Sequence, residues 1–217
     1  MQEGQPAITK SKYLNNRGLF ALVVVPMCIA VLLKMTTVDL ASGPGISAMI
    51  TFSVRLAVPW LFFAFAASSL FVVFPGSFSR WMLWNQRMLG LCFAAGMAWQ
   101  LFFILWLVTV QHAYYMEHAY AFHSLVEQIP GYLVLTAMVI TSFRFGRSKL
   151  SPRQWKLLHK IGIYFLWGVL FSAYWYELFY YDDIQIIDYV YFWLGFFAWG
   201  VRMLAWSKKR AHRPVTR

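Results

Sequence analysis

The stretch QWKLLHKIGIYFLWGVLFSAYWYEL, residues 154–178, decides the fold of this chain. It begins with basic residues, carries His159 near its start, and continues as a long run of apolar and aromatic residues. A run of this length predicts a membrane-crossing helix, because the hydrocarbon core of a bilayer requires about 20 helical residues. Of the five histidines, only His159 is expected at the edge of such a helix rather than in a loop or tail.

The composition of the whole chain is that of an integral membrane protein. Of its 217 residues, 60% are hydrophobic, 20% are aromatic and only 12% are charged, which is far from a soluble composition. The formal net charge is +11, but no recognisable nucleic-acid-binding module accompanies it, so we expect no nucleic-acid partner. Cys28 and Cys92 lie in apolar runs and indicate neither a disulfide framework nor a c-type haem attachment site.

Six apolar runs predict an all-α integral membrane protein, a bundle of six transmembrane helices in contact with the lipid bilayer. Residues 1–17 are expected to form a cytoplasmic tail, 18–206 the helical domain, and 207–217 a basic cytoplasmic tail. A polar loop is expected at 111–128. The predicted helices cover residues 18–35, 46–74, 88–110, 130–145, 157–180 and 184–206.

The charges predict the orientation of this bundle. If the N-terminus is cytoplasmic, every lysine and arginine except Lys34 and Arg55 falls on the cytoplasmic side. Every acidic residue except Glu3 then falls on the outer side. Cytoplasmic enrichment of cations is the rule that sets membrane topology, so both termini are predicted to be cytoplasmic.

Three polar residues in or beside the predicted helices are candidate functional residues, because polar groups in a membrane are costly. Arg55 either reaches the outer headgroups, pairs with an acidic loop residue, or binds an anion such as a haem propionate. Gln100 is expected to face the bundle interior and form an interhelical hydrogen bond. His159 either bonds water or a carbonyl at the interface, or ligates haem.

Three segments of the chain carry a resemblance to a known family. They are IPGYLVLTAMVITSF with its Thr141 and Ser142, RMLGLCFAAGMAWQ at residues 87–100, and the start of the opening stretch, with Trp155, Lys156, Leu158 and His159. These segments resemble helices of the ferric reductase-like transmembrane family, in particular the bacterial haem-binding membrane subunits of periplasmic methionine sulfoxide reductase systems. Arg55 resembles an arginine of the family's second helix. The resemblance covers roughly residues 46–210 and implies a multi-pass protein of the bacterial inner membrane.

The chain departs from the family at two of its haem-ligand positions. Gln100 stands where the family has a third-helix histidine, and Ser172 stands where it has a second fifth-helix histidine. Ser172 follows His159 by 13 residues, or about 20 Å of helix, so the two positions belong to different levels of the membrane. Neither glutamine nor serine is a good haem ligand. We therefore expect no bis-histidine haem at the outer level, and a vacated cavity near Trp99, Gln100, Ser172 and Trp175.

At the inner level the resemblance leaves room for one b-type haem. His159 would be one axial ligand, and Met88 or Gln86 on the third helix is the candidate for the other. Packing is the alternative role of Met88, because most apolar methionines pack.

The predicted outer loop contains HAYYMEHAYAFH, which is rich in histidine. Imidazoles with carboxylates suit transition metals, so a metal site is one reading of this loop, and a solvated loop is the other. Such a loop could also be where an external metal or partner docks. The candidate metal ligands are His112, His118, His123 and Glu127.

Three functions are compatible with these patterns. The first, which the lost histidines favour, is a haem-depleted membrane anchor or partner subunit of a redox or assembly system, bound to another membrane or periplasmic protein. The second is an electron-transfer subunit of an oxidoreductase with a single haem at His159. Its electrons would come from quinol or from a separate flavoprotein, because no flavin domain is expected after Trp206. The third is lipid or small-molecule binding in the vacated cavity. No catalytic residue is identified.

Overall fold

The computed structural model describes residues 14–119, 122–180 and 184–211, and within these ranges it contains helices and no strand. Side chains are described for 14–118, 128–180 and 184–211. The long helices are α2 (Asn16–Met35), α3 (Gly43–Val73), α4 (Ser77–Val110), α6 (Phe122–Ser142), α8 (Pro152–Tyr180) and α9 (Ile186–Ala211). The short ones are α5 (His112–Tyr114), the π-helical turn η1 (Tyr115–Ala119) and α7 (Arg144–Arg147).

The chain is a helical membrane protein. Four helices, α2, α3, α4 and α8, are long and apolar enough to cross a bilayer. The opening stretch of the sequence forms most of α8, as predicted. In α6 the apolar part is shorter, Gln128–Ser142.

Each of the six predicted helices is present, but several begin earlier than predicted. Helix α4 begins at Ser77 rather than at 88, directly after the Pro75–Gly76 break. The hydroxyl of Ser79 accepts a hydrogen bond of 3.0 Å from Gly76 N–H and so supports this start. The first turns of α4 mix polar residues such as Arg80 and Asn85 with apolar ones, so they do not belong to the continuous apolar run from which the helix was predicted. Helix α8 likewise begins at Pro152, where Ser151 and Gln154 form a reciprocal cap.

The predicted polar loop at 111–128 is largely helical. It contains α5, η1 and the first turns of α6, which begins at Phe122 rather than at 130. At the other end of the chain, α9 continues to Ala211, so part of the predicted basic tail is helical.

Helix α3 is central to the packing, since it contacts α2, α4, α8 and α9. Its contact with α4 is the most extensive in the molecule and includes Gly96 of α4, where an added Cβ would lie 2.6 Å from the Cβ of Ala57. The main core gathers α3, α4, α6, α8 and α9 around aromatic side chains such as Phe62, Phe65 and Phe93.

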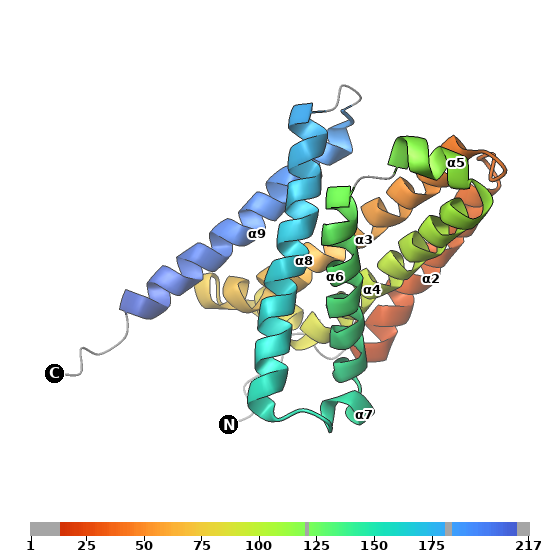
Figure 1. Ribbon diagram of the computed structural model, residues 1–217. Helices are drawn as coiled ribbons and strands as arrows, with labels where there is room; N and C mark the ends of the chain where they lie inside the picture. The colour runs from red at the N-terminus through yellow and green to blue at the C-terminus, as the bar shows by residue number, and fades with distance from the viewer. Residues whose placement is uncertain (1–13, 120–121, 181–183, 212–217) are drawn as a thin grey trace.

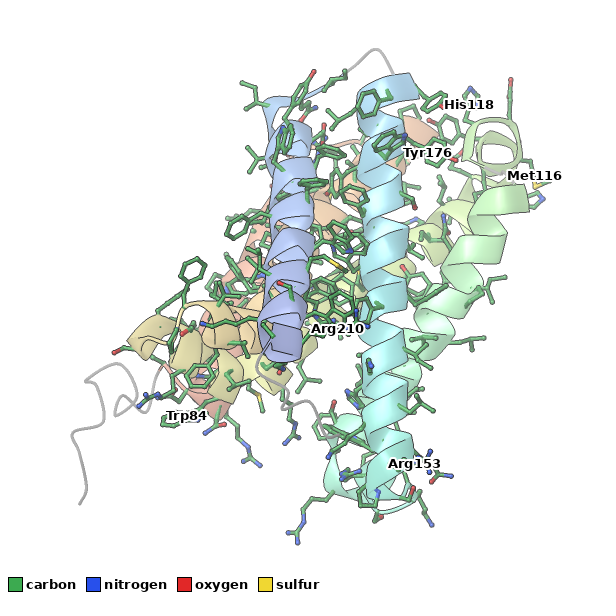
Figure 2. All side chains as sticks on the ribbon, turned by 90° about the vertical axis from the view of Figure 1, so that its left-hand side faces the viewer. Trp84, Met116, His118, Arg153, Tyr176 and Arg210 are labelled. Atoms are coloured by element: carbon green, nitrogen blue, oxygen red, sulfur yellow. The ribbon has the colours of Figure 1, made fainter. Side chains whose placement is uncertain are left out.

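The two ends of the molecule differ in their side chains. One end carries α7, the start of α2 and the end of α9, and the other carries α5, the end of α8 and the start of α9 (Figure 1). We call them the α7 end and the α5 end. Figure 2 shows Arg153 and Arg210 toward the α7 end, and His118 and Tyr176 at the α5 end.

Candidate functional site

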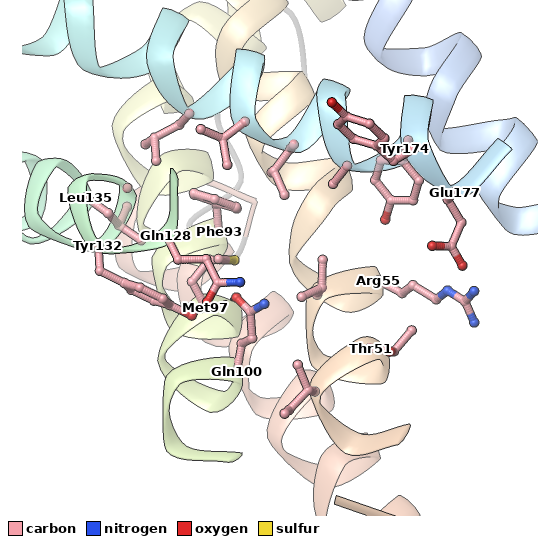
Figure 3. Close-up of a pocket in the computed structure, with 18 of the residues that line it drawn as sticks. Thr51, Arg55, Phe93, Met97, Gln100, Gln128, Tyr132, Leu135, Tyr174 and Glu177 are labelled. Atoms are coloured by element: carbon pink, nitrogen blue, oxygen red, sulfur yellow. Dashed lines mark hydrogen bonds between the residues drawn. The ribbon is translucent and has the colours of Figure 1, made fainter. Parts of the chain in front are cut away.

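A cavity of about 400 Å³ opens among α3, α4, α6 and α8 in the half of the molecule toward the α5 end (Figure 3). We call it the α5-end cavity. Most of its wall is apolar, with Phe93 and Met97 from α4, Leu135 from α6, and Leu166 and Leu170 from α8. A few polar side chains in a largely apolar wall are typical of small-molecule sites.

One wall of the cavity carries uncharged polar groups. The hydroxyl of Tyr132 on α6 donates a hydrogen bond of 2.7 Å to Gln100 Oε1 on α4. Gln100 Nε2 makes no hydrogen bond with the described residues, so its two N–H donors remain available. Gln128 lies beside this pair (Figure 3). The wall can therefore bind a carbonyl or hydroxyl group.

The opposite wall carries charged groups. Arg55 on α3 contacts both carboxylate oxygens of Asp188 at 2.9 Å and donates to Gln185 at 2.7 Å. The Asp188 side chain is 2% exposed and that of Arg55 is 20% exposed, so this is a largely buried ion pair. Glu177 lies on the same side of the cavity as Arg55 (Figure 3). Of the roles considered for Arg55, pairing with an acidic residue is the one that the structure shows, and that residue lies in the first turn of α9 rather than in a loop.

The expected vacated site has a different lining from the one predicted. Of the four residues expected around it, only Gln100 lines the cavity. Ser172 donates to the Val169 carbonyl at 2.9 Å within its own helix, and α8 presents Val169 and Ala173 to the cavity instead. One residue of displacement turns a helical side chain by about 100°, which is enough to leave this face.

The two tryptophans expected in the same cavity pack elsewhere. Trp99 stacks on Phe103, with a ring-centroid distance of 6.0 Å, in the core between α3 and α4. Trp175 is 45% exposed and contacts Phe179 and Phe192. The aromatic residues that line the cavity are instead Phe93, Tyr132, Tyr174 and Tyr176.

His159 lies near the α7 end, between α8 and α6. Its Nε2 atom is 3.1 Å from the hydroxyl of Thr141 on α6. Its ring lies against that of Trp155, with centroids 4.3 Å apart, and Trp155 Nε1 donates to the Thr141 carbonyl at 3.0 Å. The guanidinium of Arg147 lies over the Trp155 ring, 4.5 Å from the ring centroid. His159 thus connects α8 to α6.

These residues do not fit a haem at His159 in the arrangement observed. An axial ligand must direct a free nitrogen lone pair into an open space, whereas Nε2 faces the Thr141 hydroxyl. His159 lines neither the α5-end cavity nor the groove described below. Met88 packs in a cluster with Leu19 and Leu89, and the Gln86 amide donates to the Ala64 carbonyl at 2.8 Å.

The histidines at the α5 end do not form a metal site among the described residues. His118 stacks on Tyr114, with ring centroids 4.4 Å apart, and its Nδ1 atom lies 3.9 Å from the Glu117 carboxylate. His112 is exposed on α5. The predicted ligands His123 and Glu127 belong to α6, and their side chains lie outside those the structure describes.

Gln128 and Tyr132, the two polar residues beside Gln100 in the cavity, were not predicted from the sequence. They are four residues apart at the polar start of α6 and therefore share a helix face. That spacing was a usable signal, but the segment before 130 was read as a loop. Comparison of the chain with protein-family models, with curated proteins and with solved structures finds no match.

Proposed function

We propose that this protein is a six-span subunit of the bacterial inner membrane that binds an uncharged, membrane-soluble molecule in the α5-end cavity. The observation that carries the proposal is the pairing of Gln100 with Tyr132 in a cavity whose lining is mostly apolar. Free amide donors and a phenol oxygen suit a carbonyl or hydroxyl head group, and the apolar wall suits a ring or an acyl body. A quinone or quinol has this chemistry.

Helices α6 and α9 are the two further spans in this proposal. Helix α6 has 21 residues, or about 31 Å, which matches the roughly 30 Å of a hydrocarbon core. Besides the three basic residues of its last turn, α9 contains two charges, and both have partners: Asp188 pairs with Arg55, and Arg202 lies 4.1 Å from the Phe65 ring and 4.5 Å from the Tyr164 ring. A compensated charge costs much less in a bilayer than a free one.

In the same proposal the chain is a haem-depleted relative of the ferric reductase-like family and does not conduct electrons alone. Three features support this: Gln100 bonds Tyr132, Ser172 bonds its own helix, and His159 faces Thr141. The protein then acts as an anchor or partner subunit of a redox or assembly system and supplies the bound molecule to its partner.

The test is to purify the protein in mild detergent, extract it with organic solvent and identify the released molecules by mass spectrometry. We expect a quinone-like molecule at close to one per chain. Ala173→Trp, which fills the cavity, should remove it, and Gln100→Leu should weaken binding of added ubiquinone by about tenfold through loss of the amide donors. Ser172→Ala is the matched control on α8, because Ser172 does not line the cavity.

Two results would overturn the proposal. One is a protein that neither copurifies with such a molecule nor binds added ubiquinone. The other is a Soret band in the reduced spectrum that disappears in His159→Ala, which would establish haem binding and electron transfer instead.

A further inference from the structure

A second hollow, a groove of about 700 Å³, lies between α2, α4 and α6. We call it the α2–α6 groove. Its floor is formed by small residues of α4, namely Ala94, Ala95 and Ala98, which keep α4 narrow where α2 and α6 flank it. The remaining wall is mainly apolar. A long groove with this lining fits an acyl chain better than it fits a compact solute.

Two arginines stand at the α7 end of this groove, Arg17 at the start of α2 and Arg87 on α4. The start of α2 is held in place because Asn16 N–H donates to Asn85 Oδ1 on α4 at 2.9 Å. The guanidinium of Arg87 lies 5.5 Å from the centre of the Phe143 ring. Both arginines thus line one end of one groove.

The positive charge at this end is not compensated within the part of the chain that the structure describes. Neither Arg17 nor Arg87 forms an ion pair there, and both are exposed. The carboxylates whose side chains are described belong to the α2–α3 connection, to η1, and to the adjoining ends of α8 and α9, all toward the α5 end. The groove therefore has a mainly apolar wall along its length and, at its α7 end, two arginines that no described carboxylate neutralises.

We infer that the α2–α6 groove binds one anionic phospholipid from the leaflet at the α7 end. Its phosphate lies between Arg17 and Arg87, and one acyl chain follows the alanine floor. Arginine binds phosphate oxygens through paired N–H donors, so two arginines at one end of the groove suit a phosphate group. From Arg87 to Leu101 the groove follows α4 for about 21 Å, longer than the roughly 15 Å of hydrocarbon in one leaflet. The groove is therefore long enough for a whole acyl chain.

The experiment measures bound lipid by native mass spectrometry of the full chain in detergent, titrated with phosphatidylglycerol or with phosphatidylcholine. For the wild type we expect one tightly bound phosphatidylglycerol and weaker binding of phosphatidylcholine. Arg17→Gln and Arg87→Gln should each weaken phosphatidylglycerol binding by about tenfold and bring the two lipids toward equal affinity. Ala98→Phe, which fills the groove without changing charge, should weaken both lipids.

Arg80→Gln is the matched control, since Arg80 is an exposed arginine of α4 at the same end that does not line the groove. The inference is overturned if Arg80→Gln weakens binding as much as Arg87→Gln does, because the lipid would then respond only to overall charge. It is also overturned if the Arg17→Gln, Arg87→Gln double variant keeps its preference for phosphatidylglycerol. The result is independent of the α5-end cavity, whose Ala173→Trp variant should bind phosphatidylglycerol like the wild type.

Discussion

Arg55, Gln100 and His159, the three polar residues that the sequence singles out in its apolar runs, each have a partner on another helix. Arg55 pairs with Asp188 on α9, Gln100 with Tyr132 on α6, and His159 with Thr141 on α6. A polar group in a membrane is costly unless it is paired, so these contacts hold helices together. Gln100 differs in that it lines a cavity and that its amide N–H groups have no partner among the described residues, so it is the one that can also bind a ligand.

The Arg55–Asp188 pair gives the first prediction. Asp188→Asn should lower the free energy of unfolding by about 3 kcal/mol, because it leaves a largely buried guanidinium without its counter-charge. Thermal unfolding in mild detergent measures this. Glu117→Gln, which changes a carboxylate that is 76% exposed at the same end, should have little effect.

A second variant separates the pair from the packing around it. Arg55→Met with Asp188→Leu removes both charges and should be less damaging than Asp188→Asn alone, because no unpaired charge remains. Equal stability of Asp188→Asn and the wild type would show that the pair does not hold α9 to α3.

Among the helices, the contact between α3 and α4 depends on the absence of a side chain at Gly96. An alanine there would place its Cβ 2.6 Å from the Cβ of Ala57 and 3.0 Å from its Cα, a backbone atom that cannot turn away. Gly96→Ala should therefore lower the free energy of unfolding by about 1–3 kcal/mol through overpacking. Thermal unfolding in detergent again provides the measurement.

Gly90 on the same helix is the matched control for Gly96. Nothing lies within 4 Å of a Cβ added at Gly90, so Gly90→Ala should be neutral or slightly stabilising through helix propensity. If the two variants were equally stable, close approach at Gly96 would not limit how α3 and α4 pack.

The long helices were predictable because each contains an apolar run near the length of a bilayer. Their starts were not, since α4 begins at the cap formed by Gly76 and Ser79, which hydropathy does not report, and since the part of α6 before Pro130 includes polar residues. The interior position of Gln100 followed from its cost in lipid, but its partner did not. Tyr132 lies on α6, and the sequence pattern of a single helix does not determine which of its faces meets a neighbouring helix. For the same reason the prediction that Ser172 lines the cavity was wrong: the rotation of α8 about its axis directs Val169 and Ala173 to the cavity instead.

Across the whole molecule, the two hollows share the wall formed by Met97, Tyr132 and Leu135. One opens toward the α5 end beside a neutralised ion pair, and the other has two arginines at its α7 end. Helix α6 borders both, so its placement in the membrane decides which leaflet each hollow meets.

The six-span topology is the last prediction, and it is tested by replacing Cys28 and Cys92 with alanine and introducing single cysteines at exposed positions near the helix ends. In intact cells, an impermeant maleimide should label Thr37→Cys and Gln185→Cys but not Ser148→Cys or Ser207→Cys, which should react only after the membrane is opened. The reason is that cations gather at the α7 end, and cation-rich segments stay in the cytoplasm. Labelling of Ser148→Cys from outside would show that α6 does not cross between η1 and α7. Labelling of Ser207→Cys from outside, with Gln185→Cys also labelled, would show that α9 lies along the outer surface, and Asp188 would then hold an interfacial helix rather than a sixth span.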